Sequence, residues 1–417
     1  MQMQPNSMLK IALTANLVEW YEFSLTSFMA LQIGQIFFPV ATDKTAIFFS
    51  FTVFAVSYLV RPFGGIFFGI LGNRYGTGTA LKISMIGMSI PASTIFILPT
   101  YKMAGYFATS SLLLTKILQG FCAGGELPLS GYFVSLNTDN KNRGFYSSLV
   151  VVSGFIGMLL ASTTVSLLPY LNVQQSKWFG VTYLSDSWRW PFLLCIPLSI
   201  AIFFLRSSID CTNKNNMHVK YHEKTGLPLL QAFILVAFME AVIYSVIVWM
   251  PQYLHTYLRI SAFDAHITNV ITIFIFSFAI ICVGYASRFF GAGKFVLIGV
   301  VSLTFTSYPL FLVLQKGDFL RLLLVQIAFA CMTACVVGVI FVILTDLFRK
   351  SWGNLGMSST YSIATAIFGG ASPLICTYLV NVTHLLIAPA FYLLSLGLLA
   401  APVACRMSLT ACKKVHS

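Results

Sequence analysis

The chain has 417 residues, of which 58% are hydrophobic and only 9% are charged. A soluble globular protein carries roughly 25% charged residues, so this composition excludes a soluble protein of this size. The net charge of +13 does not indicate nucleic-acid binding, because the cytoplasmic loops of membrane proteins collect Lys and Arg. We therefore expect a membrane protein, with the lipid bilayer as its first partner.

Apolar runs of about 20 residues recur along the chain, the length needed to cross a hydrocarbon core of about 30 Å. They are long and continuous rather than short and alternating, which favours helices over a β-barrel. The first run contains two glutamates and is expected to be a retained span rather than a cleaved signal peptide. Twelve spans are predicted, at residues 11–39, 46–72, 80–100, 105–135, 145–169, 190–206, 229–255, 267–286, 294–314, 319–347, 357–382 and 385–405.

The longest polar stretch, 207–228, follows six predicted spans and precedes six more. We therefore predict an all-α membrane protein with an N-terminal six-helix bundle at 1–206, a cytoplasmic linker at 207–228 and a C-terminal six-helix bundle at 229–417. With the N-terminus inside, the cytoplasmic segments carry more than twice as many Lys and Arg residues as the outer ones. This asymmetry predicts that both termini are cytoplasmic.

A weak internal repeat links the two predicted bundles. Span 2 ends with Gly69, Asn73, Arg74 and Gly76, and span 8 ends with a similar glycine-bearing segment that contains Arg288. The two segments occupy equivalent places in the two halves, and parallel six-helix repeats are a known transporter architecture. We interpret both as parts of a gate motif, with coincidence as the alternative.

Two glutamates lie inside the first span. A charge at the bilayer centre costs about 2.5–3.5 kcal/mol on insertion scales, so such residues usually face a cavity or a partner. Glu19 and Glu22 are three residues apart, which puts both carboxylates on one helical face. Their mutual repulsion favours a proton on one of them, as proton coupling requires. The alternative is a pair in the headgroup region near Lys10 that stays ionised.

The fourth span carries Lys116 and Glu126, ten residues apart and nearly three helical turns from each other. They cannot bond directly, so each needs a partner on another helix. Arg61 in the second span is a candidate partner for a carboxylate of span 1 or span 4. These charges either switch partners during transport or form a static cluster that fixes helix packing.

Glu240 is the single acidic residue inside the apolar helices of the second half, apart from one at a predicted cytoplasmic end. It binds a substrate cation, carries a proton, or is a protonated packing residue. Trp20, Tyr21, Tyr244 and Tyr361 lie deep in their spans and are candidates for an aromatic wall around a cationic nitrogen. Lipid-facing aromatic residues are the alternative.

Several sequence motifs resemble one family. The chain is similar to the metabolite:proton symporter branch of the major facilitator superfamily, and within it to proline/betaine transporters. The motifs that carry the resemblance are Asn16 with EWYEF at 19–23, RPFGG at 61–65, K…QGF…GGE at 116–126, RGF at 143–145, WRWPF at 188–192, MPQYL at 250–254 and IFGG at 367–370.

The resemblance implies the major facilitator fold, alternating access, proton-coupled symport and a central site between the bundles. It implies coupling and binding roles for Glu22 (an Asp in the family), Arg61, Lys116 and Glu126. It also implies a multi-pass protein of the bacterial inner membrane, with the proton as coupling ion and no cofactor. We expect a monomer.

The sequence departs from the family at the predicted cytoplasmic gate. Asn73 and Ser287 stand where the family has an Asp in each half, and Thr77 and Gly78 stand at two of its basic positions. Glu240 replaces an expected neutral polar residue. These departures suggest looser gating, a shifted substrate or decayed activity.

Three function classes follow from these observations. The first is a proton-coupled symporter of a small osmolyte or amino acid such as proline or betaine, with small organic anions (dicarboxylates, oxoacids) as the next substrate class. The second is a non-transporting remnant or sensor on the same fold. An enzyme is not expected, since the sequence shows neither an HExxH motif nor a Cys/His cluster, and the nine Cys residues have no CxxC spacing that would indicate a metal site.

Overall fold

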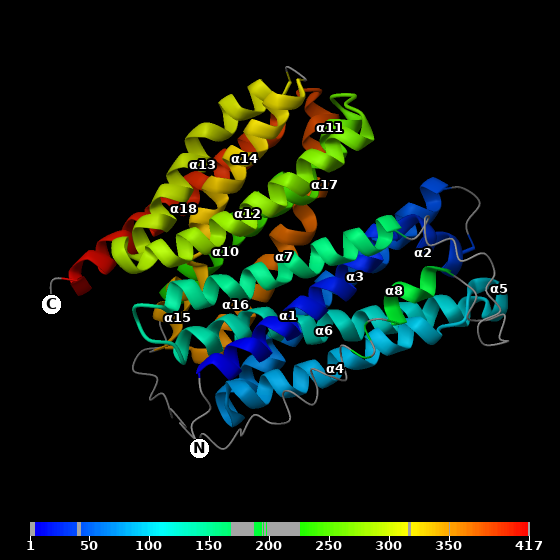
Figure 1. Ribbon diagram of the computed structural model, residues 1–417, viewed down its shortest axis with the longest axis horizontal. Helices are drawn as coiled ribbons and strands as arrows, with labels where there is room; N and C mark the ends of the chain where they lie inside the picture. The colour runs from blue at the N-terminus through cyan, green and yellow to red at the C-terminus, as the bar shows by residue number, and fades with distance from the viewer. Residues whose placement is uncertain are drawn as a thin grey trace. The chain divides into compact units, whose positions relative to one another are not determined.

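The computed structural model of the protein describes residues 5–39, 43–167, 187–193, 195, 197, 226–315, 318–349 and 351–415. These residues form helices joined by short connections (Figure 1). A helix satisfies all its backbone hydrogen bonds within one segment, which is why long apolar runs adopt it in lipid.

The chain forms two compact units, which are described separately. The first comprises residues 1–130 and 153–216, and the second comprises residues 131–152 and 217–417. The expected linker at 207–228 lies almost entirely outside the described residues, and the division at that linker stays a prediction.

The long helices α1, α3 and α4 lie entirely in the first unit, whereas α6 ends in the second unit and α7 begins there. The bounds of the described helices are α1 (Pro5–Phe28), α2 (Ala30–Phe37), α3 (Asp43–Tyr75), α4 (Thr77–Ile97), α5 (Tyr101–Ala104), α6 (Tyr106–Leu136), α7 (Arg143–Leu167), η2 (Ser187–Arg189) and α8 (Trp190–Leu193).

In the second unit, the long helices α12, α13, α14 and α18 pack side by side (Figure 1). The bounds of the described helices are α10 (Leu227–Ile243), η3 (Tyr244–Val248), α11 (Met250–Thr256), α12 (Ala262–Phe290), α13 (Ala292–Leu314), α14 (Phe319–Val337), α15 (Ile340–Phe348), α16 (Gly353–Ala364), η4 (Thr365–Gly369), α17 (Gly370–Thr383) and α18 (Ala388–Val415). The segments η3 and η4 are π-helical turns inside otherwise α-helical spans.

Eight helical segments of the described residues are long and apolar enough to cross a membrane. They include α7, α12, α13, the α14–α15 segment and α18. The helices α1, α4 and α6 also coincide with predicted spans. The predicted span 190–206 lies mainly outside the described residues.

Helices α3 and α6 touch through glycines. A methyl group on Gly120 would lie 2.7 Å from the carbonyl carbon of Ser57, and one on Gly124 would lie 2.9 Å from the backbone nitrogen of Gly65. Real Cβ atoms do not approach other atoms so closely, so these positions accept only glycine without a shift of one helix. Glycines at these positions of α6 allow the close approach of the two helices.

The two halves of the predicted repeat share a backbone conformation. Gly76 joins α3 to α4 with φ of 94°, and Gly291 joins α12 to α13 with φ of 85°. Both angles lie in the region that favours glycine, and both glycines directly precede a helix. The two segments therefore resemble each other in backbone conformation as well as in sequence.

Arg189 closes the end of α4. Its side chain is 1% exposed, and its Nη1 donates hydrogen bonds to the carbonyl oxygens of Phe96 (2.7 Å) and Leu98 (2.9 Å). These carbonyls lie at the C-terminal end of the helix, where no intrahelical amide can reach them. Its guanidinium carbon lies 4.3 Å from the ring centre of Trp188. The WRWPF motif thus has a structural role in this unit.

Candidate functional site

A buried ammonium group connects α1 and α6 in the first unit. The Nζ of Lys116 donates hydrogen bonds to Thr26 Oγ1 at 2.6 Å and to Gln119 Oε1 at 2.5 Å. Lys116 is 2% exposed. Both bonds go to neutral groups, so they hold the ammonium in place without neutralising its charge.

Glu22 lies one helical turn before Thr26 on α1 and is also 2% exposed. No ion pair of 4.0 Å or less joins it to Lys116 among the described residues, so the two buried charges act on each other at longer range. Its Oε1 accepts no hydrogen bond from the part of the chain that the structure describes. The pair therefore consists of an ammonium with neutral partners and a carboxylate that retains a free acceptor.

Glu126 is held by hydroxyl groups. Ser84 on α4 donates a short hydrogen bond to Oε2, and Ser130, one turn further along α6, donates to Oε1 at 3.5 Å. Glu126 is 2% exposed. The prediction that Lys116 and Glu126 each find a partner on another helix is confirmed, since α1 provides Thr26 and α4 provides Ser84.

Arg61 on α3 sits among aromatic rings. Its guanidinium carbon lies 4.7 Å from the ring centre of Phe23 and 4.1 Å from that of Tyr58, distances typical of cation–π contacts. The two rings meet edge to face, with centres 5.4 Å apart. The suggested exchange of ionic partners by Arg61 stays a prediction.

Three further candidate residues lie on α1, and they differ in their contacts. Glu19 is 8% exposed, so both glutamates of the first span are buried in protein, and the choice between a proton-coupling pair and a headgroup pair stays a prediction. The hydroxyl of Tyr21 donates to Thr164 Oγ1 (3.4 Å) and to the carbonyl of Pro191 (3.3 Å), which connects α1 with α7 and α8. Trp20 packs against Gly154 of α7.

A second buried carboxylate lies in the second unit, on α10. Glu240 is 5% exposed and faces η4, where a methyl group on Gly369 would lie 3.3 Å from Glu240 Oε2. The same point lies 3.2 Å from Tyr244 Cε2 and 3.2 Å from Thr365 Cγ2. Tyr361, one turn before Thr365, stacks on Phe341 with ring centres 5.9 Å apart. An aromatic wall that also includes Trp20 and Tyr21 stays a prediction.

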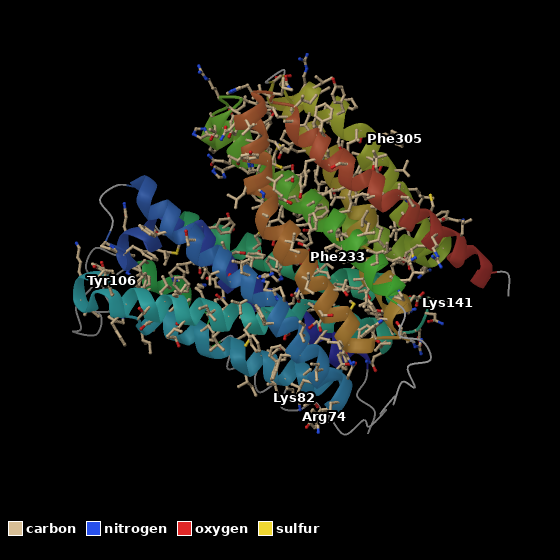
Figure 2. The ribbon with its side chains drawn as sticks, turned by 180° about the vertical axis from the view of Figure 1, so that it is seen from behind. Arg74, Lys82, Tyr106, Lys141, Phe233 and Phe305 are labelled. Carbon is tan, nitrogen blue, oxygen red and sulfur yellow. The ribbon has the colours of Figure 1, made fainter. Side chains whose placement is uncertain are left out.

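The predicted gate residues lie at helix ends. Gly69, Asn73 and Arg74 are in the last two turns of α3, and Figure 2 shows Arg74 at the same end of the first unit as Lys82 of α4. The guanidinium of Arg74 lies 5.3 Å from the ring centre of Tyr75. In the second unit, Arg288 lies over Tyr285 at 4.3 Å. Both arginines thus pack on a neighbouring aromatic ring.

A contact that the sequence did not indicate ties the start of α7 to α15 and α12. Arg143 Nη1 forms an ion pair with Asp346 Oδ1 at 3.0 Å, and Arg143 Nε donates to the carbonyl oxygen of Ser135 at 3.1 Å. The adjacent Gly144 packs on α12, where a methyl group on it would lie 2.6 Å from the carbonyl oxygen of Gly284. All these residues belong to the second unit.

Sequence reasoning found the charged residues but missed the groups that hold them. Thr26, Ser84, Ser130 and Thr365 were not singled out. Three of them had a usable signal, because Thr26 and Ser130 follow a glutamate by four residues and Thr365 precedes the double glycine by four. Hydroxyls at that spacing share a helical face with the residue four positions away.

Comparison with known proteins identifies the family. The family model "Major Facilitator Superfamily" matches residues 13–374. The chain belongs to this superfamily. It is therefore a multi-pass membrane protein of a transporter family and not an enzyme.

Curated relatives within the superfamily are similar over nearly the whole chain. The glycine betaine/proline/ectoine/pipecolic acid transporter OusA of Dickeya dadantii is 29% identical over 429 residues, covering 97% of this chain and 84% of its own length. The proline/betaine transporter of Escherichia coli K12 is 28% identical, again covering 97% of this chain and 84% of its own length. The predicted resemblance to proline/betaine transporters is confirmed.

Solved structures show the same fold. The proton:xylose symporter XylE, bound to a bromodeoxyglucose, has a TM-score of 0.73 and 17% identity, with 97% of this chain and 95% of that chain covered. At this identity the likeness establishes the fold alone. The predicted major facilitator fold, all-α with two six-helix bundles, is confirmed.

Proposed function

We propose that this superfamily member is a proton-coupled symporter of a small zwitterionic osmolyte or amino acid, such as betaine or proline. It works by alternating access in a bacterial inner membrane, with both termini in the cytoplasm. The relatives named above are transporters of such solutes, which supports the substrate class. No cofactor other than the coupling proton is needed.

The observation that carries the proposal is the Glu22–Lys116 pair. Two of the three ammonium hydrogens of Lys116 are engaged by Thr26 and Gln119, which leaves one for an anionic partner. When Glu22 is ionised, its negative charge balances that of Lys116. When Glu22 binds a proton, Lys116 becomes available to the carboxylate of a substrate.

This competition links the two ligands. Protonation of Glu22 leaves the charge of Lys116 unbalanced, and a buried unbalanced charge is costly. A substrate carboxylate restores neutrality. The carrier is therefore most stable with proton and substrate both bound or with neither bound. That condition is what symport requires.

The test is uptake by the purified protein in proteoliposomes. Labelled betaine, proline and a dicarboxylate are offered with and without an inward proton gradient. Gradient-driven accumulation of betaine or proline is expected. Uptake indifferent to the gradient would exclude symport, preference for the dicarboxylate would move the substrate class to organic anions, and no uptake of any solute would favour the remnant.

Glu22→Gln tests the coupling residue. Glutamine mimics a protonated carboxyl group, so gradient-driven accumulation is expected to be lost while exchange of internal for external substrate persists. The matched control is Asp318→Asn, because Asp318 is an exposed carboxylate at the start of α14. Accumulation by Glu22→Gln equal to that of the control would remove Glu22 from the coupling site.

A further inference from the structure

Three side chains of the second unit converge on the backbone of Gly369. They are Glu240 and Tyr244 from the α10–η3 helix and Thr365 from η4. All three are less than a tenth exposed. A Cβ on Gly369 would sit 3.2–3.3 Å from atoms of all three, so the three side chains close tightly around this position and a methyl group would fit only after a small shift.

Both helices change their winding at this place. The π-helical turn η3 begins at Tyr244, and η4 runs from Thr365 to Gly369. In η3, the backbone amide of Trp249 donates to the carbonyl of Tyr244 at 2.9 Å, five residues back. π-Helical turns are rare, cost regular hydrogen bonding and are frequent at functional sites. Two that pack against each other's helices indicate a site rather than a packing accident.

The two helices are firmly packed beside the site. The rings of Phe233 on α10 and Phe368 on η4 meet edge to face with centres 6.0 Å apart, and Figure 2 shows Phe233 within the second unit. Ser245 on η3 contacts Cys376 of α17, with Oγ and Sγ 3.3 Å apart. These contacts join the α10–η3 helix to η4 and to α17.

Thr365 contributes an unmet polar group. Its Oγ1 is buried and has no hydrogen-bond partner in the described ranges. Native proteins satisfy nearly all buried polar groups, and the exceptions call for a ligand or another explanation. Here the hydroxyl belongs to a residue whose methyl group already faces Glu240 and Tyr244 across Gly369.

We propose that this Glu240 site (Glu240, Tyr244, Thr365 and Gly369) binds the positively charged nitrogen of the transported solute. The proposal rests on the proposed function and adds which residues recognise the cationic group. Glu240 provides the countercharge, and the Tyr244 ring provides a π face that attracts cations. The Thr365 hydroxyl accepts a hydrogen bond from a nitrogen that carries hydrogen. The solute reaches these buried groups when the two π-helical turns move apart.

The chemistry distinguishes two solutes. The quaternary nitrogen of betaine carries no hydrogen, so it uses the charge of Glu240 and the ring of Tyr244 only. The secondary ammonium of proline carries two hydrogens and also uses Thr365. Organic anions without a cationic nitrogen are repelled by Glu240, which gives the carrier selectivity against them.

The decisive experiment compares betaine with 3,3-dimethylbutanoate, in which carbon replaces the charged nitrogen at nearly constant shape. Competition for labelled betaine uptake is measured in proteoliposomes for wild type, Glu240→Gln and the control Ser245→Ala. Wild type and Ser245→Ala are expected to prefer betaine by about tenfold or more, in line with a buried charge interaction. Glu240→Gln is expected to lose most of that preference. An unchanged preference in Glu240→Gln would overturn the proposal.

Thr365→Val provides an independent arm, because valine keeps the shape and removes the hydroxyl. Affinity for proline is expected to fall several-fold while affinity for betaine stays constant. Equal losses for both solutes would remove Thr365 from the site. This variant also tests the site where Glu240→Gln fails to fold.

A binding measurement separates this proposal from the transport activity. Calorimetric titration of the purified protein with tetramethylammonium is expected to show binding to wild type and to Ser245→Ala, and at least tenfold weaker binding to Glu240→Gln. That result without any uptake would support the site and contradict the symporter. Displacement of tetramethylammonium by equimolar Na⁺ would assign the site to an inorganic cation and overturn the proposal.

Discussion

The glycine contact between α3 and α6 makes Gly120→Ala a severe test of the fold. The added methyl group would lie 2.7 Å from the carbonyl carbon and 2.8 Å from the Cα of Ser57. Nonbonded carbon atoms are normally about 3.5–4.0 Å apart, so the two helices have to separate by about 1 Å. The neighbouring atoms are backbone and cannot turn away, which places the cost near the upper end of the usual range for overpacking, about 3 kcal/mol.

The assay is thermal unfolding in detergent, followed with a thiol-reactive dye that labels the buried Cys122 and Cys195 as they become exposed. For a unit of this size, a loss of that order lowers the Tm by about 6–12 °C. The control is Gly226→Ala, because Gly226 has a φ of −71° and no atom within 4 Å of an added Cβ. A Tm for Gly120→Ala no lower than that of the control would refute the packing argument.

Two more predictions concern buried arginines and use the same assay, with the buried Cys376 as the reporter for the second unit. Arg143→Ala is expected to lower the Tm more than Asp346→Asn. The arginine variant loses the hydrogen bonds to Ser135 as well as the ion pair. The asparagine variant loses only the ion pair, which is worth about 1 kcal/mol or less because the Asp346 side chain is 39% exposed. Equal shifts would assign the whole effect to the ion pair. Arg189→Lys is expected to destabilise the first unit by about 1–3 kcal/mol, because the fully buried guanidinium holds two carbonyls at the end of α4 in a geometry that an ammonium does not reproduce. A Tm of Arg189→Lys equal to that of wild type would show that a positive charge alone stabilises the end of α4 to the same extent.

The helices could be predicted because the bilayer permits few alternatives. The apolar run predicted at 294–314 is the helix α13, Ala292–Leu314, and the run predicted at 267–286 lies inside α12, Ala262–Phe290. In lipid a long apolar segment has to satisfy its backbone hydrogen bonds internally, so hydropathy alone predicts that the segment is helical. The π-helical turns within 229–255 and 357–382 escaped prediction, because one extra residue in a turn leaves the apolar composition unchanged.

The charged residues of the site were predictable and their partners were not. A buried charge is conspicuous in an apolar sequence. Lys116 and Glu126 were therefore each predicted to have a partner on another helix. Their partners are the hydroxyls of Thr26 and Ser84, which look like many other hydroxyls in the chain. Which one is used depends on how α1 and α4 lie against α6. That is set by packing over long sequence separations, which the local pattern does not encode.

The altered gate motif has a physical counterpart at the start of α7. Ser287 stands where the family resemblance led us to expect an Asp, and a methyl group on Gly144 would lie 3.2 Å from its Cβ. A longer carboxylate side chain would not fit against α7 at this distance. The close approach of Gly144 to α12 and the ion pair of the adjacent Arg143 with Asp346 instead hold this end of the second unit together. Packing at Gly144 acts only at contact distance, whereas the charge pair acts over several ångströms. Because Asp346 supplies an acidic partner from α15, the absence of an Asp at position 287 does not leave this helix end without an ion pair.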